Sequence, residues 1–156
     1  MSYIALATTT LGSAASSVTF SSIPTSVNGV ALRDLILICN TSNGTTGEIR
    51  LHMNGDTTGT TVRMFGSGSG SGLSDTATNR LEIGYLAARG VCIASIMDYS
   101  QTDKHKTVLS RWSDAANYVG ANAARWANTN AINSVRVFTP AESFPSGSTF
   151  SLYGVA

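Results

Sequence analysis

The segment Thr149–Val155 (TFSLYGV) alternates side chains of two kinds, and this alternation decides the fold class. In an extended chain, Phe150 and Leu152 point to one side while Ser151 and Tyr153 point to the other. A period of two residues is typical of a β-strand with one buried face and one face in water. The segment therefore predicts a strand at the edge of a hydrophobic core.

Short apolar or alternating runs of the same kind recur along the whole chain, separated by turn residues such as the Asn-Gly pairs at 28–29, 43–44 and 54–55. Many short strands with this spacing predict an all-β, antiparallel β-sandwich, and we expect a jelly roll. Leu35–Cys39 is apolar on both faces, which favours either a central strand or a subunit interface. The further predicted strands are Tyr3–Thr8, Ser17–Ser21, Asp34–Asn40, Glu48–Met53, Thr61–Phe65, Arg80–Leu86, Val91–Met97, Thr107–Trp112, Tyr118–Trp126 and Ser134–Phe138.

The chain length of 156 residues suits one domain spanning residues 1–156. A glycine–serine repeat at residues 66–72 predicts a flexible loop between two strands, because neither the lysine nor the helix start of a phosphate-binding loop follows it. Strand periodicity selects the residues that we expect to be buried. They are Val18, Phe20, Leu35, Leu37, Ile93, Val137, Phe150 and Leu152.

Charge and hydropathy exclude several classes of partner. The net charge is +1 with no basic stripe, so we expect no nucleic-acid binding. No apolar run reaches the roughly 18 residues of a membrane helix, and Met1–Ile4 lacks the features of a signal peptide, so we expect a soluble protein made in the cytosol. Cys39 and Cys92 both lie in apolar runs, and the sequence leaves their pairing open.

Groups that could perform chemistry are few. Neither histidine has metal-ligand spacing, and Asp56 in the Asn-Gly-Asp turn has too few neighbouring carboxylates for calcium. Asp98 and Asp103 lie in one polar loop, where turn formation is favoured over the paired carboxylates of a glycosidase. We therefore predict no cofactor, no metal and no enzymatic activity. Lys104 and Lys106 predict a solvated turn.

Aromatic and arginine residues gather in one third of the chain. Tryptophan, tyrosine and arginine dominate binding hot spots, and tryptophan can also stack on a sugar or on a partner's ring. The alternative is that both tryptophans pack in the core. The candidate partner-binding residues are Arg111, Trp112, Tyr118, Arg125 and Trp126.

The chain also resembles a family of small virion surface proteins of tailed bacteriophages, whose relatives include terminal domains of tail-fibre proteins. The resemblance implies an all-β virion surface domain, with a homotrimer as the expected assembly, made in the host cytoplasm and placed on the outer surface of the virion. It supplies no active-site residues. The stretches that carry it are Ile4–Ser13, Val18–Phe20, Ile23–Pro24, Leu51–Asp56, Met97–Ser100, Lys106–Arg111, Trp126–Thr129, Ala131–Ile132 and Gly147–Val155.

Three functions are compatible with these observations. The leading hypothesis is a capsid decoration (cement) protein that braces the major capsid protein or another virion protein, since the sequence has no heptad or collagen-like shaft. The alternative is a tail-fibre or receptor-binding domain that contacts a host glycan, motivated by the region from Trp112 to Trp126. A small glycan hydrolase is the remote alternative, because no acid–base pair is identifiable.

Overall fold

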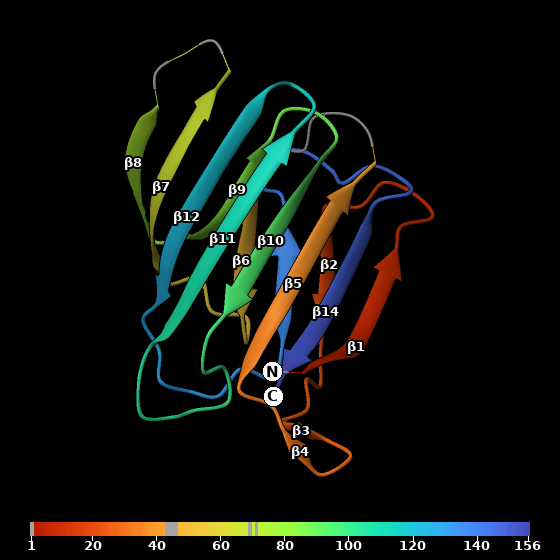
Figure 1. The fold of residues 1–156 in the computed structure, drawn as a ribbon, viewed down its shortest axis with the longest axis vertical. Coiled ribbons are helices and arrows are strands. Elements are labelled where there is room, and N and C mark those ends of the chain that lie inside the picture. Colours follow the sequence, from red (N-terminus) through yellow and green to blue (C-terminus); the bar gives the residue numbers. More distant parts are fainter. Residues whose placement is uncertain (1, 43–46, 69, 71) are drawn as a thin grey trace.

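The computed structural model describes residues 2–42, 47–68, 70 and 72–156, and within these residues all regular structure is β-strand (Figure 1). Two antiparallel sheets pack face to face as a sandwich. The all-β, single-domain sandwich that strand periodicity predicts is therefore confirmed.

The larger sheet lies in front of the smaller one in Figure 1 and contains eight of the described strands in the order β1-β14-β5-β10-β11-β12-β7-β8. Neighbouring strands are antiparallel throughout. Their bounds are β1 Tyr3–Thr10, β5 Asp34–Thr41, β7 Thr60–Ser67, β8 Leu73–Thr78, β10 Gly90–Ile96, β11 Lys106–Asp114, β12 Tyr118–Trp126 and β14 Thr149–Val155.

The smaller sheet contains four described strands in the order β2-β13-β6-β9. Along the sequence the chain passes between the sheets repeatedly, as it does in a jelly roll: β5, β7 and β10 belong to the larger sheet, and β6 and β9 to the smaller. The bounds are β2 Ser17–Phe20, β6 Gly47–Met53, β9 Leu81–Leu86 and β13 Val135–Phe138, with a separate short hairpin of β3 Ser26–Val27 and β4 Val30–Ala31.

Each segment that the sequence predicts as a strand is one, with ends that differ by a few residues. Three strands were not predicted: β3, β4 and β8. The segment of β8 (LSDTAT) is mostly exposed and has little apolar character, so no hydrophobic alternation marks it. It forms a strand because its backbone pairs with β7 from Thr60↔Thr78 to Phe65↔Leu73.

The core between the sheets contains all but one of the residues predicted to be buried. Ile93 is the exception: it is only half-buried, and its prediction was wrong. In β10 the side chains of Cys92 and Ala94 point inward and are fully buried, so the alternation of the strand turns Ile93 to the outer face of the larger sheet.

Lys106 also departs from the prediction of a solvated turn. It begins β11 facing inward and is fully buried. Its Nζ donates hydrogen bonds to the carbonyl oxygens of Lys104 at 2.9 Å and Thr129 at 3.1 Å. These two bonds, rather than water, satisfy the ammonium, while burial lowers the pKa of Lys106.

Three further expectations concern particular segments. Gly66 and Ser67 belong to β7, so the predicted flexible loop is shorter at its start, and residues 69 and 71 of it lie outside the described residues. Cys39 and Cys92 are directly opposite each other on β5 and β10, and both are buried free thiols. No helix long and apolar enough to cross a membrane occurs in the described part of the chain.

The two ends of the chain lie side by side at the lower end of the sandwich in Figure 1. Tyr3 near the N-terminus pairs with Val155 near the C-terminus, and the amide of Ala156 donates to the carbonyl oxygen of Ser2 at 3.2 Å. The strand order makes β1 an edge strand, and β14 is its neighbour in the sheet.

Candidate functional site

The residues predicted to form one partner-binding surface are divided between the two faces of the larger sheet. Trp112 and Trp126 point inward from β11 and β12, and both are buried. Arg111 and Arg125, the residues immediately before them, are exposed on the opposite face. Successive side chains of a β-strand point to opposite faces of the sheet, so each arginine and the tryptophan that follows it lie on opposite faces.

Trp126 has a structural partner in Asp56. Its indole Nε1 donates to Asp56 Oδ2 at 2.9 Å, and Asn128 Nδ2 donates to the same oxygen at 3.2 Å. The other oxygen, Oδ1, accepts from the amide and the hydroxyl of Thr58, both at 2.8 Å. These hydrogen bonds, led by that from the Thr58 amide, lower the pKa of Asp56 to about 2.

The Asn-Gly-Asp segment itself is a tight turn. Asn54 and Gly55 have φ of 54° and 77°, and the amide of Asp56 donates to the carbonyl oxygen of Met53 at 2.9 Å. Positive φ at both central residues is what an Asn-Gly pair accommodates. Within the residues described, no group of three His, Cys, Asp or Glu side chains could hold a metal ion.

Asp98 and Asp103 both lie beside the ammonium of Lys104, at 3.6 Å and 3.7 Å from Nζ. Asp98 has a φ of 50° and its carbonyl oxygen accepts from the Gln101 amide at 3.1 Å, which is turn geometry. The two carboxylates therefore surround one lysine within a single loop.

A pocket of about 310 Å³ lies where the larger sheet extends beyond β9, the edge strand of the smaller sheet. Strands β7 and β12 supply one wall and β6 and β9 the other. Trp112 and Tyr118 are the only predicted site residues that line it. The full lining is Glu48, Arg63, Phe65, Glu82, Tyr85, Trp112 and Tyr118.

The indole of Trp112 fits into this wall because two glycines leave room for it. A β-carbon at Gly120 would lie 2.4 Å from Trp112 Cζ2, and one at Gly84 would lie 3.2 Å from Trp112 Cγ. Trp112 Nε1 donates to Asn122 Oδ1 at 3.3 Å. The two glycines, one from each sheet, thus fix the ring at the inner end of the pocket.

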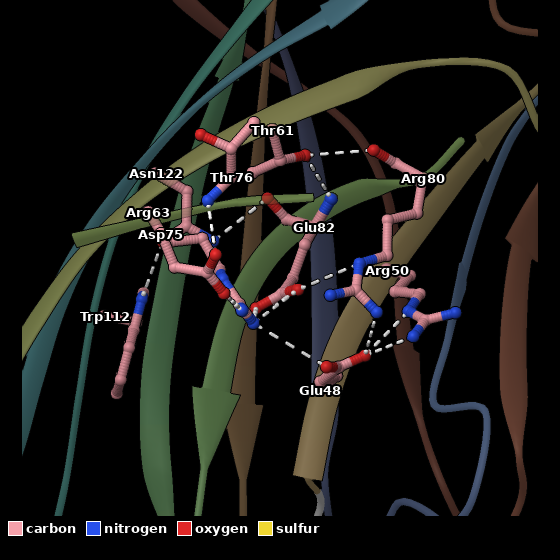
Figure 2. Close-up of polar contacts among 10 residues, drawn as sticks. All are labelled: Glu48, Arg50, Thr61, Arg63, Asp75, Thr76, Arg80, Glu82, Trp112 and Asn122. Atoms are coloured by element: carbon pink, nitrogen blue, oxygen red, sulfur yellow. Dashed lines mark hydrogen bonds and ion pairs between the residues drawn. The ribbon is translucent and has the colours of Figure 1, made fainter. Parts of the chain in front are cut away.

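Three of the lining residues, Glu48, Arg63 and Glu82, belong to a network of charged side chains (Figure 2). Arg63 Nη1 donates to both carboxylate oxygens of Glu82 at 3.1 Å, and Arg63 Nη2 donates to Asp75. Arg80 lies 3.5 Å from Glu48 and 3.7 Å from Glu82. The network continues from Glu48 to Arg50, whose Nε donates to Glu48 Oε2 at 2.9 Å (Figure 2).

The central pair of this network is Arg63 and Glu82. Glu82 is almost fully buried, and burial raises the pKa of its carboxyl against the lowering effect of the hydrogen bonds from Arg63. Burial opposes ionisation of Arg63 as well, but the hydrogen bonds to Asp75 and Glu82 outweigh it and raise the pKa of Arg63. Removing Arg63 would leave the buried carboxylate of Glu82 with Arg80 at 3.7 Å as its ion-pair partner. Removing Glu82, by contrast, would leave Arg63 paired with Asp75.

Backbone contacts hold Glu82 in place. Its amide donates to Thr61 Oγ1 at 2.9 Å, and its carbonyl oxygen accepts from Asn122 Nδ2 at 3.0 Å. Thr61 belongs to β7 and Asn122 to β12, so β9 is fastened to the overhanging part of the larger sheet at this point (Figure 2).

A second surface of interest is the outer face of the larger sheet, which faces away from β6 and β9. Its exposed side chains include Met64, Leu109 and Val119, which are 61%, 49% and 60% exposed. Strand register places Leu109 between Ser95 and Ala123. The apolar residues of this outer face are Ile36, Ile38, Val62, Met64, Val91, Ile93, Leu109 and Val119.

The charges on this outer face that have no ion-pair partner in the described part of the chain are arginines. Arg111 lies between Ile93 and Ala121 across the strands, and Arg125 pairs with Thr107 and Thr60. By strand alternation, the described strands of the larger sheet place one carboxylate on this face, that of Asp34 at the start of β5, and it is buried and paired with Arg33. Neither arginine takes part in an ion pair among the residues that the structure describes.

Comparison with known proteins yields no protein-family model and no curated protein that matches this chain. Among solved structures, it is similar to exo-inulinase from Aspergillus awamori, at 13% identity and a TM-score of 0.45, covering all of this chain and 29% of that one. An alginate lyase in complex with an alginate tetrasaccharide is similar at 9% identity and a TM-score of 0.28, covering 94% of this chain and 78% of that one. This chain thus spans less than a third of the inulinase.

Proposed function

We propose that this protein is a non-catalytic structural subunit of a virion surface, a capsid decoration protein that attaches through the outer face of its larger sheet. The apolar character of that face carries the proposal. Large exposed apolar patches mark protein–protein contact sites in soluble proteins. The sequence resemblance to virion surface proteins of tailed bacteriophages supports the setting.

The outer face is large enough for a stable contact. Eight strands about 4.8 Å apart and about seven residues long, at about 3.3 Å per residue, cover roughly 800 Å². A specific interface of standard size buries about 800 Å² on each partner. If this protein binds the shell protein only in the assembled shell, then binding through this face stabilises the assembled shell by mass action.

The charge of the face favours a different protein over a second copy of this chain as the occupant. A two-fold contact between two such faces would offer Arg111 and Arg125 no free carboxylate, because the carboxylate of Asp34 on this face is already paired with Arg33. We therefore propose a partner with an apolar surface that carries carboxylates opposite Arg111 and Arg125. The homotrimer predicted from the resemblance would then form through other surfaces.

The first experiment is to locate the chain on purified particles by cryo-electron microscopy. Density for the sandwich repeated over the shell, with the outer face of the larger sheet against the capsid, is the expected result. Density confined to the tail would instead favour the tail-fibre alternative. An outer face pointing into solvent on the shell would contradict the attachment that we propose.

Binding of variants to particles that lack this protein tests the same face. Leu109→Glu and Arg111→Glu place negative charge on it, and we expect both to abolish cosedimentation with the particles. Thr19→Glu is the matched control, because Thr19 is exposed on β2 of the smaller sheet. Unchanged binding of Leu109→Glu, or self-association of the free protein that Leu109→Glu abolishes, would exclude the proposed partner.

A further inference from the structure

We infer that the pocket between β7 and β9 binds one uncharged sugar residue. This site lies on the other side of the larger sheet from the proposed attachment face, so the inference does not depend on that proposal. It rests on the walls of the pocket, on its unused hydrogen-bonding atoms and on its balanced charge.

The walls of the pocket combine aromatic rings with charged side chains. Tyr85 and Tyr118 are 40% and 37% exposed, so their rings are accessible, while Trp112 is buried deeper. The face of an aromatic ring is electron-rich and packs against the C–H groups on one side of a pyranose. Small-molecule sites in proteins have this character, with mostly apolar walls and a few placed polar groups.

Hydrogen-bonding atoms that face the pocket remain available. Glu48 Oε2 accepts from Arg50, but Glu48 Oε1 lies 3.7 Å from Arg63 Nη1, which is beyond hydrogen-bond distance. Within the described residues, the hydroxyls of Tyr85 and Tyr118 also make no hydrogen bond. A carboxylate oxygen and two phenolic hydroxyls can together accept from and donate to sugar hydroxyls.

The balance of charge selects an uncharged ligand. Glu48, Arg63 and Glu82 line the pocket and belong to a network that has no net charge, because three arginines are paired with three carboxylates: Arg50, Arg63 and Arg80 with Glu48, Asp75 and Glu82. An anionic sugar would meet an arginine already paired with carboxylates, and a cationic ligand would meet a carboxylate already paired with arginines. Neither would gain an unpaired counter-charge on binding.

The size of the pocket limits the ligand to one ring. Its volume of about 310 Å³ is at the lower end of the roughly 300–1,000 Å³ of ligand pockets. A longer glycan would therefore insert one residue, with the remaining sugars extending past Tyr85 and Tyr118 into solvent.

The test is a ¹H–¹⁵N NMR titration of the full chain with single sugars at millimolar concentration. The uncharged probes are glucose, galactose, mannose and N-acetylglucosamine. Glucuronate, sialic acid and tetramethylammonium are the charged comparisons. We expect at least one uncharged sugar to shift the amide signals of Glu48, Tyr85 and Tyr118 at saturable concentration. If none does, or if only a charged probe does, the inference is wrong.

Matched tyrosine variants separate binding from folding. Tyr118→Ala and Tyr85→Ala should each weaken the sugar about tenfold, because each removes one stacking ring. Tyr3→Ala is the control, since Tyr3 is an exposed tyrosine of β1 outside the pocket, and it should bind as the unaltered chain does. Glu48→Gln retains the shape of the side chain and should weaken binding by removing the charged acceptor. Equal affinity in Tyr118→Ala and Tyr3→Ala would overturn the assignment.

Discussion

Asp56 shows how one carboxylate connects distant parts of the chain. It closes the turn after β6 and accepts a hydrogen bond from the buried indole of Trp126, seventy residues away. Asp56→Ala would leave that N–H without a partner inside the protein, which costs about 1–3 kcal/mol. We expect urea denaturation to show a loss of about 2 kcal/mol. A loss below about 0.5 kcal/mol would mean that water replaces the carboxylate.

The same carboxylate makes stability depend on pH. Its pKa is about 2 in the folded chain and 3.8 ordinarily, so its contribution is complete above pH 3.8 and is lost as the pH falls toward 2. Asp56→Asn lacks this titration. The difference in unfolding free energy between the two proteins should therefore shrink by about 1 kcal/mol between pH 5 and pH 2, after allowance for solvent screening. Thermal melts across this range measure it, and a constant difference would contradict it.

Gly120 tests the placement of Trp112. Because a β-carbon there would lie 2.4 Å from the indole, Gly120→Ala must displace the ring or the strand. We expect a loss of about 1–3 kcal/mol, as for other overpacked cores, together with a change in tryptophan fluorescence. Gly12→Ala is the control, since nothing lies within 4 Å of its β-carbon position. Similar stability in the two variants would mean that Trp112 moves freely.

At the scale of the strand, alternation determines how much a core deletion destabilises. Phe150 on β14 is fully buried, whereas Ile93 on β10 is half-buried on the outer face. Phe150→Ala should cost about 3–5 kcal/mol, and Ile93→Ala less than about 1 kcal/mol. Chemical denaturation of both variants measures the difference. Equal losses of unfolding free energy in the two variants would mean that the Ile93 side chain is buried, contrary to its position on the outer face.

Strands with apolar periodicity could be predicted from the sequence, and strands without it could not. Alternation located β14 and β13 because each buries one face. It missed β8, which forms through backbone pairing to β7. It also misjudged Lys106, because two carbonyl oxygens from the backbone satisfy the ammonium, and the sequence does not reveal where a backbone carbonyl lies.

The candidate pocket could be predicted only in part, for a reason that concerns the packing of whole sheets. Trp112 and Tyr118 were selected by residue type, but Glu48, Arg63 and Tyr85 come from three other strands. These residues meet only because the larger sheet overhangs β9. Nothing in the local sequence around Arg63 indicates that it faces Glu82.

At the scale of the molecule, the two cysteines report on global unfolding. Cys39 and Cys92 are fully buried, and burial raises the pKa of both thiols. The folded protein should therefore be almost inert to a thiol reagent at pH 8, and both thiols should react once denaturant unfolds the sandwich. Timed labelling with mass spectrometry measures this. Fast labelling of one thiol in the folded protein would reveal local opening of β5 or β10.

The meeting of the two chain ends has a mechanical consequence. Tyr3 and Val155 are the first residue pair of the β1–β14 ladder. A force that pulls these two residues apart would act on that pair first, perpendicular to both strands. The hydrogen bonds of the pair would then break one after another, as in opening a zipper, instead of sharing the load as they do in shear. A tether joined to both ends would therefore peel β1 away at low tension, while one joined to a single end would load the sandwich differently.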